Sequence, residues 1–188
     1  MLAGGASERM GEDKLLLEVG GLTLVERVYR VLQAACEEVL VVGRDSVPIA
    51  GVRFARDLRP GREGPLAGIE AGLHAAAHPV VFVAAGDMPF LSVGLVERLA
   101  GLVRGGARAA VPWWEGPHPL CAAYDRTLLP RVSCFLDSGG RAVRGFLGNL
   151  ERVIYLGEDE LSGIGDPSLM LMNVNTPEDL ARARRVAG

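Results

Sequence analysis

Short apolar runs alternate with amphipathic segments along most of this chain, and this alternation limits the possible folds more than any other feature. In the first half, the predicted segments are a helix at 22–35, strands at 38–42 and 52–55, a helix at 65–77, a strand at 80–85 and a helix at 91–103. In the second half they are strands at 109–113, 120–124, 153–156 and 170–174, and helices at 126–136, 141–150 and 177–186. Strands that alternate with helices predict an α/β fold with a mostly parallel central sheet covered on both faces. Ligands bind such sheets beyond the carboxyl ends of the strands.

Composition narrows the class of protein. The 188 residues fit a single domain, and a chain of this length buries roughly 70% of its unfolded surface. No apolar run reaches the roughly 18 residues of a membrane span, and the net charge of −3 gives no basic footprint for a nucleic acid. The 3 cysteines lack CxxC spacing, which argues against a zinc site or a disulfide framework. We therefore expect a cytoplasmic enzyme or binding protein whose partner is a small molecule and neither nucleic acid nor a membrane.

The segment LAGGASERMGEDK, residues 2–14, crowds glycine and positive charge into one loop. It lacks the spacing of GxxxxGK[ST] and of GxGxxG, so it matches neither a P-loop nor a dinucleotide fingerprint. The remaining interpretation is a nucleoside triphosphate site, in which the N–H groups of Gly4 to Ser7 hold phosphate oxygens and the side chains of Arg9 and Lys14 neutralise departing pyrophosphate. Lys14 is the only lysine of the chain, and its compact charge suits a phosphate chain. The alternative is an ordinary glycine turn with solvated charges.

Polar residues after two of the predicted strands indicate a metal site. Asp87 follows the apolar run 80–85, so its carboxylate should lie at the same edge of the sheet as the first loop. Mg²⁺ takes one or two protein carboxylates and completes its shell with water and substrate phosphates, and Asn173 and Asn175 could contribute. The alternatives are a turn aspartate at 87 and helix caps at Asn175 and Thr176.

Several motifs occur in the order in which one family carries them. They are LAGGASERMGEDK, RDLRPGREGPLAGIEAGL, GDMPF, PHPLCAAYDRTLLPRVSCFLDSGGRAVRGFL and NVNTPEDL. With these motifs the chain closely resembles the molybdenum cofactor guanylyltransferases (the MobA family) over nearly its whole length. The first motif is shared with related cytidylyltransferases and sugar-nucleotide pyrophosphorylases, whereas GPLAG and NTPEDL are more discriminating. The resemblance implies a three-layer, Rossmann-like nucleotidyltransferase fold, with residues 1–105 as a nucleotide-binding half and 106–188 as a pterin-substrate half.

The resemblance also implies a reaction. Enzymes of this family transfer GMP from GTP to the molybdopterin-bound molybdenum cofactor and release pyrophosphate, with Mg²⁺ or Mn²⁺ as the metal. The nucleophile is the terminal phosphate of molybdopterin, which is already anionic at neutral pH, so no general base is required. Catalysis is then positioning and charge neutralisation of an in-line displacement at the α-phosphorus. The implied protein partners are those that deliver molybdopterin or mature molybdoenzymes.

By position, the resemblance assigns roles to individual residues. The nucleotide would be lined by Leu2, Ala3, Gly4 and Gly5 with Asp57 on the guanine, and the catalytic set would be Arg9, Lys14 and Asp87. The metal would be held by Asp87 and Asn175, and the pterin would be contacted by His118, Pro119, Arg141 and Arg144. A single carboxylate accepts the paired N1–H and amine donors of guanine, which adenine and cytosine lack. The alternatives are a turn residue at Asp57 and solvated helix arginines at 141 and 144.

Two departures from the family pattern stand out. Family members carry asparagine after the second strand, where this chain has Gly43, Arg44 and Asp45, so either backbone replaces that contact or the base is held differently. A strand of about five or six residues should precede Leu2, and we hypothesise that the native start lies upstream, which mass spectrometry of the native protein would test. Two other functions stay open: transfer of CMP or another nucleotide to a related cofactor, and nucleotide binding by a regulator without turnover.

Overall fold

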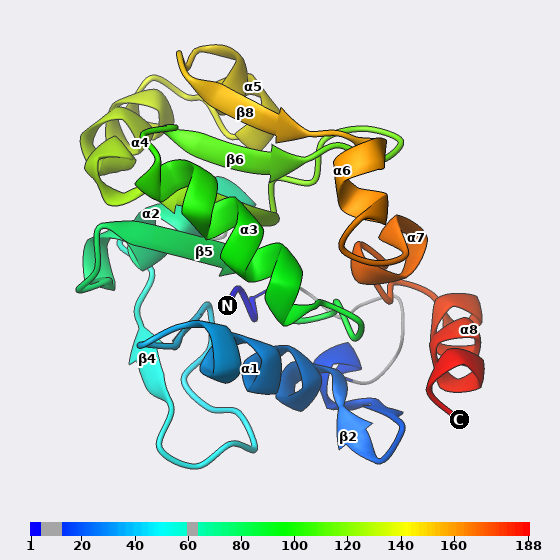
Figure 1. Ribbon diagram of the computed structural model, residues 1–188. Helices are drawn as coiled ribbons and strands as arrows, with labels where there is room; N and C mark the ends of the chain where they lie inside the picture. The colour runs from blue at the N-terminus through cyan, green and yellow to red at the C-terminus, as the bar shows by residue number, and fades with distance from the viewer. Residues whose placement is uncertain (5–12, 60–63) are drawn as a thin grey trace.

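The computed structural model describes residues 1–4, 13–59 and 64–188, and Figure 1 shows the arrangement of its helices and strands. The helices are α1 (Leu24–Ala35), α2 (Pro65–Ala75), α3 (Val93–Arg104), α4 (Leu129–Asp137), α5 (Val143–Gly148), α6 (Glu158–Ser162), α7 (Pro167–Met170) and α8 (Pro177–Ala187). The strands are β1 (Glu18–Val19), β2 (Leu22–Thr23), β3 (Leu40–Val42), β4 (Arg53–Ala55), β5 (Val80–Ala84), β6 (Ala109–Pro112), β7 (Cys121–Asp125) and β8 (Val153–Leu156). Two short 3-10 turns are η1 (Lys14–Leu16) and η2 (Arg126–Leu128).

Among the described strands of the central sheet, β7 is the one that runs against its neighbours. The order β5-β7-β6-β8 has β7 antiparallel to β5 and β6, and β8 parallel to β6. β3 and β4 pair in parallel, and Leu2 joins the two groups through parallel bridges to Val42 and Ala85. The prediction of a mostly parallel sheet is confirmed, and β3, β4, β5, β6 and β8 all end at one carboxyl edge.

Helices cover both faces of this sheet. Neighbouring side chains of a strand point to opposite sides, so the sheet has two apolar faces and each is buried by helices. One core contains Ala84, Ala110 and Ala123 together with residues of α1 and α3. The other contains Val83 and Ala122 together with residues of α2, α4 and α5. The predicted three-layer α/β architecture is therefore confirmed.

Side-chain caps determine where α1 and α3 begin. Thr23 accepts a hydrogen bond from the Glu26 N–H, and the Glu26 carboxylate accepts one from the Thr23 N–H, which forms a capping box at the end of β2. The helix predicted from Leu22 therefore begins at Leu24, since Leu22 pairs with β1. Ser92 caps α3 in the same way, through its side-chain oxygen.

The strand predicted at 170–174 is wrong. Residues Pro167–Met170 form α7, whose first turn is favoured by Pro167 and by the Asp166 carboxylate, which accepts from the Ser168 N–H at 2.8 Å. The following residues pass the end of β5, where the Val174 N–H donates to the Asp87 carbonyl at 2.9 Å. The apolar run is buried by side-chain packing and not by pairing in a sheet, which explains why its composition suggested a strand.

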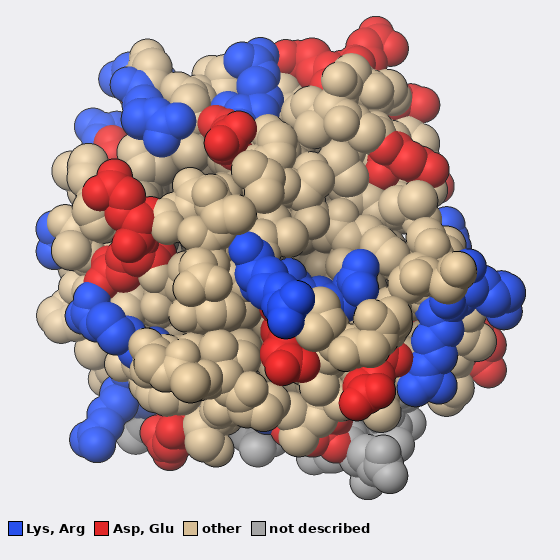
Figure 2. Space-filling view, turned by 60° about the horizontal axis from the view of Figure 1, so that its bottom comes forward, with Lys and Arg blue, Asp and Glu red and all other residues tan. Residues whose placement is uncertain are grey.

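The surface carries charges of both signs. On the face seen in Figure 2, Lys and Arg side chains are interspersed with Asp and Glu side chains over a largely uncharged background. None of the helices that the structure describes is both long and apolar enough to cross a membrane.

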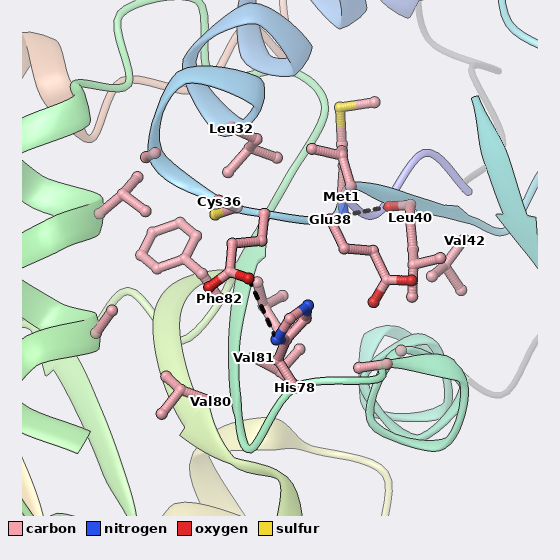
Figure 3. A pocket seen from close by; sticks show the side chains of 18 of the residues that line it. Met1, Leu32, Cys36, Glu38, Leu40, Val42, His78, Val80, Val81 and Phe82 are labelled. Atoms are coloured by element: carbon pink, nitrogen blue, oxygen red, sulfur yellow. Dashed lines mark hydrogen bonds and ion pairs between the residues drawn. The ribbon is translucent and has the colours of Figure 1, made fainter. Parts of the chain in front are cut away.

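A cavity of 250 Å³ lies between β3 and β5, toward the amino ends of these strands (Figure 3). Its lining is largely apolar and includes Leu32, Val80 and Phe82, with Met1 beside Leu40. The Met1 ammonium donates to the Leu40 carbonyl at 2.7 Å. Burial lowers the pKa of this ammonium from 8.0 to about 5.

Candidate active site

Asp87 lies at the carboxyl edge of the sheet, just after β5, as the sequence predicts. The N–H of Gly86 donates to the Leu2 carbonyl at 2.9 Å, and the Asp87 carbonyl accepts from Val174. A Cβ at position 86 would lie 3.2 Å from the Leu2 carbonyl oxygen, so glycine allows the two backbones to approach closely. The Asp87 residue is 8% exposed. Its carboxylate is thus held by a backbone that is fixed on both sides.

The side chain of Lys14, the first residue of η1, contacts Asp87 at this edge of the sheet. Asp13 caps η1, where its carboxylate accepts from the Leu15 N–H at 3.3 Å. The Lys14 Nζ lies 2.5 Å from Asp87 Oδ2 and 3.0 Å from Asn175 Oδ1. The other carboxylate oxygen, Asp87 Oδ1, is buried and has no hydrogen-bond partner within the described part of the chain. One oxygen of Asp87 is therefore neutralised by a cation, and the other can accept a second cation.

Asn175 belongs to this cluster, and the cap of α8 is Thr176. The Thr176 hydroxyl accepts from the Asp179 N–H at 3.1 Å, and the Asp179 carboxylate accepts from the Thr176 N–H at 2.9 Å. The Asn175 N–H also donates to this carboxylate, at 3.0 Å, while its side-chain oxygen accepts from Lys14. Of the two alternatives for the Asn175 side chain, the geometry favours the cluster, and its role as a metal ligand stays a prediction.

The donor set at this edge is small and made of oxygen. In the ranges 1–4, 13–59 and 64–188, no group of three or more His, Cys, Asp and Glu side chains is placed to hold a metal ion. One carboxylate and one amide oxygen are nevertheless what Mg²⁺ takes from a protein when substrate phosphates and water complete its shell. The unpartnered Asp87 Oδ1 therefore fits a Mg²⁺ ion that arrives with a nucleotide.

The N-terminal residues predicted to line the nucleotide are fixed by backbone contacts. The Leu2 N–H donates to Ala84 at 2.7 Å, and the Ala3 N–H donates to Val42 at 2.9 Å. Gly4 lies against Gly43, so that a Cβ on Gly43 would be 2.7 Å from the Gly4 Cα. The contact of these residues with a nucleotide stays a prediction. The two other predicted residues of this loop, Gly5 and Arg9, lie outside the described residues.

Arg44 contacts both described ends of the first loop, and the sequence reasoning did not select it. Its Nε donates to the Ala3 carbonyl at 2.6 Å, its Nη2 donates to Asp13 Oδ1 at 2.7 Å, and its Nη1 pairs with the other Asp13 oxygen. Arg44 holds the pKa of Asp13 below its ordinary value, chiefly through these side-chain hydrogen bonds. Where the family has asparagine, this chain thus has a side chain that binds the protein itself. Its position directly after the predicted strand at 38–42 was the available signal.

A second arginine anchors the loop that carries Asp57. Asp57 is exposed and follows β4 at the same edge of the sheet. The Nε and Nη2 of Arg59 donate to the two carboxylate oxygens of Glu70 at 2.7 and 2.9 Å, and Nη1 donates to Asp137 at 2.7 Å. Glu70 is 2% exposed, and its pairing with Arg59 lowers the pKa of the carboxyl group. The sequence reasoning missed this pair, although a glutamate on the apolar face of a predicted helix was a visible signal.

The turn after β6 contains two of the residues predicted to contact the pterin. The His118 Nε2 lies 2.8 Å from the Trp114 carbonyl oxygen. The Pro119 carbonyl accepts from the buried Tyr124 hydroxyl at 2.7 Å. Both residues therefore shape the turn, and their contact with a pterin stays a prediction.

Of the two arginines predicted to contact the pterin, Arg144 bonds to this turn and Arg141 bonds to the end of α4. Arg141 donates to a carbonyl of α4 at 2.7 Å, and Arg144 donates to the Pro117 carbonyl at 3.2 Å. Trp113 and Tyr155 form an edge-to-face pair with ring centroids 5.3 Å apart, and they are 48% and 41% exposed. The sequence reasoning did not select this exposed pair, and the Trp113-Trp114 doublet was its only signal.

A three-layer α/β fold with a lysine and a buried carboxylate at the carboxyl edge of its sheet is the arrangement expected of a nucleotidyltransferase, and comparisons with known proteins show that class. The sequence profile of the family described as "MobA-like NTP transferase domain" matches residues 1–153. The "Molybdenum cofactor guanylyltransferase" of Desulfosudis oleivorans is 32% identical over 187 residues, which are 97% of this chain and 92% of the relative. The "Probable molybdenum cofactor guanylyltransferase" of Pelotomaculum thermopropionicum is 38% identical over 191 residues, covering 100% of this chain and 91% of the relative. The chain belongs to this family of MobA-like molybdenum cofactor guanylyltransferases.

Solved structures agree with this assignment. Molybdopterin-guanine dinucleotide biosynthesis protein A from Archaeoglobus fulgidus superposes with a TM-score of 0.84 at 29% identity, over 98% of this chain and 95% of that one. The 2-C-methyl-D-erythritol 4-phosphate cytidylyltransferase of Thermus thermophilus shares the fold, with a TM-score of 0.72 at 22% identity over 99% and 96% of the two chains. Another protein of this fold, Rv0371c of Mycobacterium tuberculosis, was solved in complex with manganese; it is 15% identical, with a TM-score of 0.68 over 98% of this chain and 95% of that one.

Proposed function

We propose that this chain transfers GMP from GTP to the terminal phosphate of the molybdopterin-bound molybdenum cofactor. The products are the guanine dinucleotide form of the cofactor and pyrophosphate. The observation that carries the proposal is the contact of Lys14 with a buried Asp87 whose second oxygen has no partner among the described residues. The names of the two relatives, which match over nearly their whole length, support the choice of GTP and the pterin as substrates.

The reaction is an in-line displacement. An oxygen of the pterin phosphate forms a bond with the α-phosphorus of GTP, and the bond from that phosphorus to the bridging oxygen of pyrophosphate breaks. The attacking phosphate is already anionic, so the protein supplies position and charge and no general base. Lys14 places its charge beside the phosphates, where negative charge develops on the departing pyrophosphate.

We propose that Asp87, with Asn175 beside it, holds Mg²⁺, for which Mn²⁺ is a substitute. The metal supplies positive charge next to the phosphates of the nucleotide. Lys14 pairs with Asp87 Oδ2, while Oδ1 is buried without a partner among the described residues. The carboxylate is therefore ready to bind a divalent cation before substrate arrives.

We propose that Asp57 recognises guanine and that the turn of His118 and Pro119, with Arg141, receives the pterin. Asp57 is exposed at the carboxyl edge, where its carboxylate can accept both donors of guanine. In the order of the sheet β6 lies two strands from β5, so the turn after β6 is about 10 Å from Asp87 along the edge. That separation suits an acceptor whose phosphate reaches the α-phosphorus while its ring binds elsewhere.

A nucleotide panel tests this function. The protein is incubated with molybdopterin, Mg²⁺ and each NTP in turn, and pyrophosphate and the dinucleotide product are measured. We expect product from GTP, and loss of pyrophosphate release in Lys14→Ala and Asp87→Ala but not in Asp159→Ala, which changes an exposed carboxylate of α6. Preference for CTP would contradict the guanine assignment. GTP binding without pyrophosphate release would indicate a regulator instead of an enzyme.

A further inference from the structure

Arg44 joins the two described ends of the first loop. Ala3 comes before residues 5–12 and Asp13 comes after them, and the guanidinium of Arg44 contacts both: the Ala3 carbonyl at 2.6 Å and the Asp13 carboxylate through two nitrogens. The three acceptors are reached by three nitrogens of one guanidinium, and a lysine could not bind all of them with the same geometry. A single side chain therefore fixes the distance between the start and the end of the loop.

The backbone beside Arg44 lies very close to the start of the first loop. Gly43 has φ +87°, and a Cβ there would lie 2.7 Å from the Gly4 Cα and 2.8 Å from the Gly4 nitrogen. Both facts require glycine at 43, since L-residues avoid this φ and have no space for a side chain. The turn after β3 is thus pressed against the start of the loop, which brings Arg44 within reach of Ala3.

The contact differs from the exposed ion pairs of this protein. The side chains of Arg44 and Asp13 are 20% and 31% exposed, whereas those of Arg98 and Glu160, which pair at 3.1 Å, are 49% and 50% exposed. Exposed single contacts of the second kind add little stability. A partly buried, bidentate pair that also binds a backbone carbonyl restricts the geometry of all three groups.

The contacts of Arg44 with Asp13 also restrict the position of Lys14, the next residue in the chain. Asp13 is the N-cap of η1 and Lys14 is its first residue. The carboxylate that Arg44 holds is the same group that accepts from the Leu15 N–H, so it sets the direction in which the turn begins. The Lys14 Nζ then meets Asp87 at the end of β5.

We propose that Arg44 is a positioning residue for the nucleoside triphosphate. By holding Ala3 and Asp13 together, it directs the Lys14 side chain toward the phosphates that bind beside Asp87. The identity of the ligand in this inference rests on the proposed function. The holding of Ala3 and Asp13 at a fixed separation, called the bracing below, rests on the contacts of Arg44. Arg44 acts through Asp13 and Lys14, and does not take part in the chemistry. Its effect should appear in nucleotide binding and turnover, not in recognition of the pterin.

Two measurements on the full chain test the proposal. The first is amide hydrogen exchange at Leu15, Leu16 and Leu17, whose N–H groups bond within and around η1. In Arg44→Ala we expect exchange about 10-fold faster at these amides, because local opening no longer breaks the Arg44 contacts. The second is GTP binding and turnover with Mg²⁺, where we expect kcat/KM for GTP to fall by roughly 10- to 100-fold, as for small misplacements of a reacting group. KM for the pterin should not change.

Two further variants distinguish positioning from general stability. Val103→Ala removes buried side-chain atoms at the far end of α3; it should lower the melting temperature while leaving GTP affinity and exchange at Leu15–Leu17 unchanged. Arg44→Lys keeps the charge but loses the fork, so its kcat/KM for GTP should lie between those of wild type and Arg44→Ala. Unchanged exchange in Arg44→Ala would overturn the bracing, and faster exchange with unchanged GTP affinity would overturn the positioning role. If the wild type binds no GTP, the proposed function and this positioning role both fail. The exchange result would still show whether Arg44 holds Ala3 and Asp13 together.

Discussion

The Nζ of Lys14 lies 2.5 Å from Oδ2 of Asp87, although the two residues are 73 positions apart in the chain. The contact brings the exit of the first loop to the end of β5, where Asp87 is almost completely buried. Residues in direct contact affect each other's contributions, so if the proposed function holds, the effects of changing these two on catalysis should not be additive.

The non-additivity of Lys14 and Asp87 can be measured. We expect Lys14→Met and Asp87→Asn each to lower kcat for pyrophosphate release by about 100- to 1,000-fold, as for other groups that stabilise developing charge. The double variant should be little worse than the more severe single variant. The matched control is Asp159→Asn in α6, which should keep wild-type rates. Multiplicative losses in the double variant would show that the two residues act independently.

The close contact of Gly43 with Gly4 makes a prediction with an internal control. Gly43→Ala combines an unfavourable φ of +87° with a Cβ 2.7 Å from the Gly4 Cα, whereas Gly51→Ala has φ +73° and no atom within 4 Å of the added Cβ. Both variants should lose about 1–2 kcal/mol of stability from backbone strain, but only Gly43→Ala should also weaken GTP binding. Urea unfolding and GTP titration measure the two effects. Equal GTP affinity in the two variants would contradict a role for the Gly4–Gly43 contact.

Much of this site follows from local sequence pattern. The apolar run 80–85 shortly before Asp87, and the cap at Thr176, are signalled by residues adjacent in the chain, and the structure places a strand and a cap where they were predicted. Only the fold determines which of these residues meet. The contact of Lys14 with Asn175 joins positions 161 apart, and no spacing in the sequence encodes it.

The features that were missed depend on long-range packing. The Arg59–Glu70 pair requires a helix to present a carboxylate to a loop, and the apolar run after α7 is buried without pairing in the sheet. Hydrophobicity predicts burial but does not say whether the burial occurs in a strand or against side chains. Arg44 was overlooked for a related reason, since its acceptors belong to a different loop.

Glu70 should make stability depend on pH in the acid range. Its pKa is lowered below the ordinary value of 4.5, first by the hydrogen bonds from Arg59. The stabilisation is therefore fully present above about pH 4.5 and is lost as the pH falls through the lower pKa of the folded protein. At pH 7 we expect Glu70→Gln to be less stable by about 1–3 kcal/mol, as for the loss of a charged hydrogen bond, and to lose less further stability on acidification than wild type. Chemical unfolding at pH 7 and pH 4 checks this.

The control for Glu70 is another glutamate that pairs with arginine. Glu160→Gln removes the exposed partner of Arg98, and its stability at both pH values should stay within about 0.5 kcal/mol of wild type. A Glu70→Gln variant that parallels wild type through the acid range would show that the buried pair does not carry this pH dependence.

The ammonium of Met1 should give a dependence of the same sign in a higher pH range. In a chain expressed from Met1, burial lowers the pKa of this group from 8.0 to about 5. Between these values the unfolded chain binds a proton that the folded chain does not, so stability should rise with pH from about 5 to 8. The full difference corresponds to on the order of 4 kcal/mol. Urea unfolding at pH 5.5 and pH 8 measures it.

Extending this chain before Met1 tests what the cavity between β3 and β5 accepts. The carbonyls of Leu40 and Ala84 already accept hydrogen bonds from Met1 and Leu2, so both strands pair with the first residues of the chain beside the cavity. We expect an extension of about four apolar residues to continue this pairing as an extended strand, to raise the melting temperature and to remove the pH dependence between 5 and 8. A Gly-Ser extension of equal length also removes the buried charge but cannot fill the cavity, so it should flatten the pH profile with a smaller gain in stability. Equal stabilisation by the two extensions would show that relief of the buried charge is sufficient and that the cavity does not bind a strand.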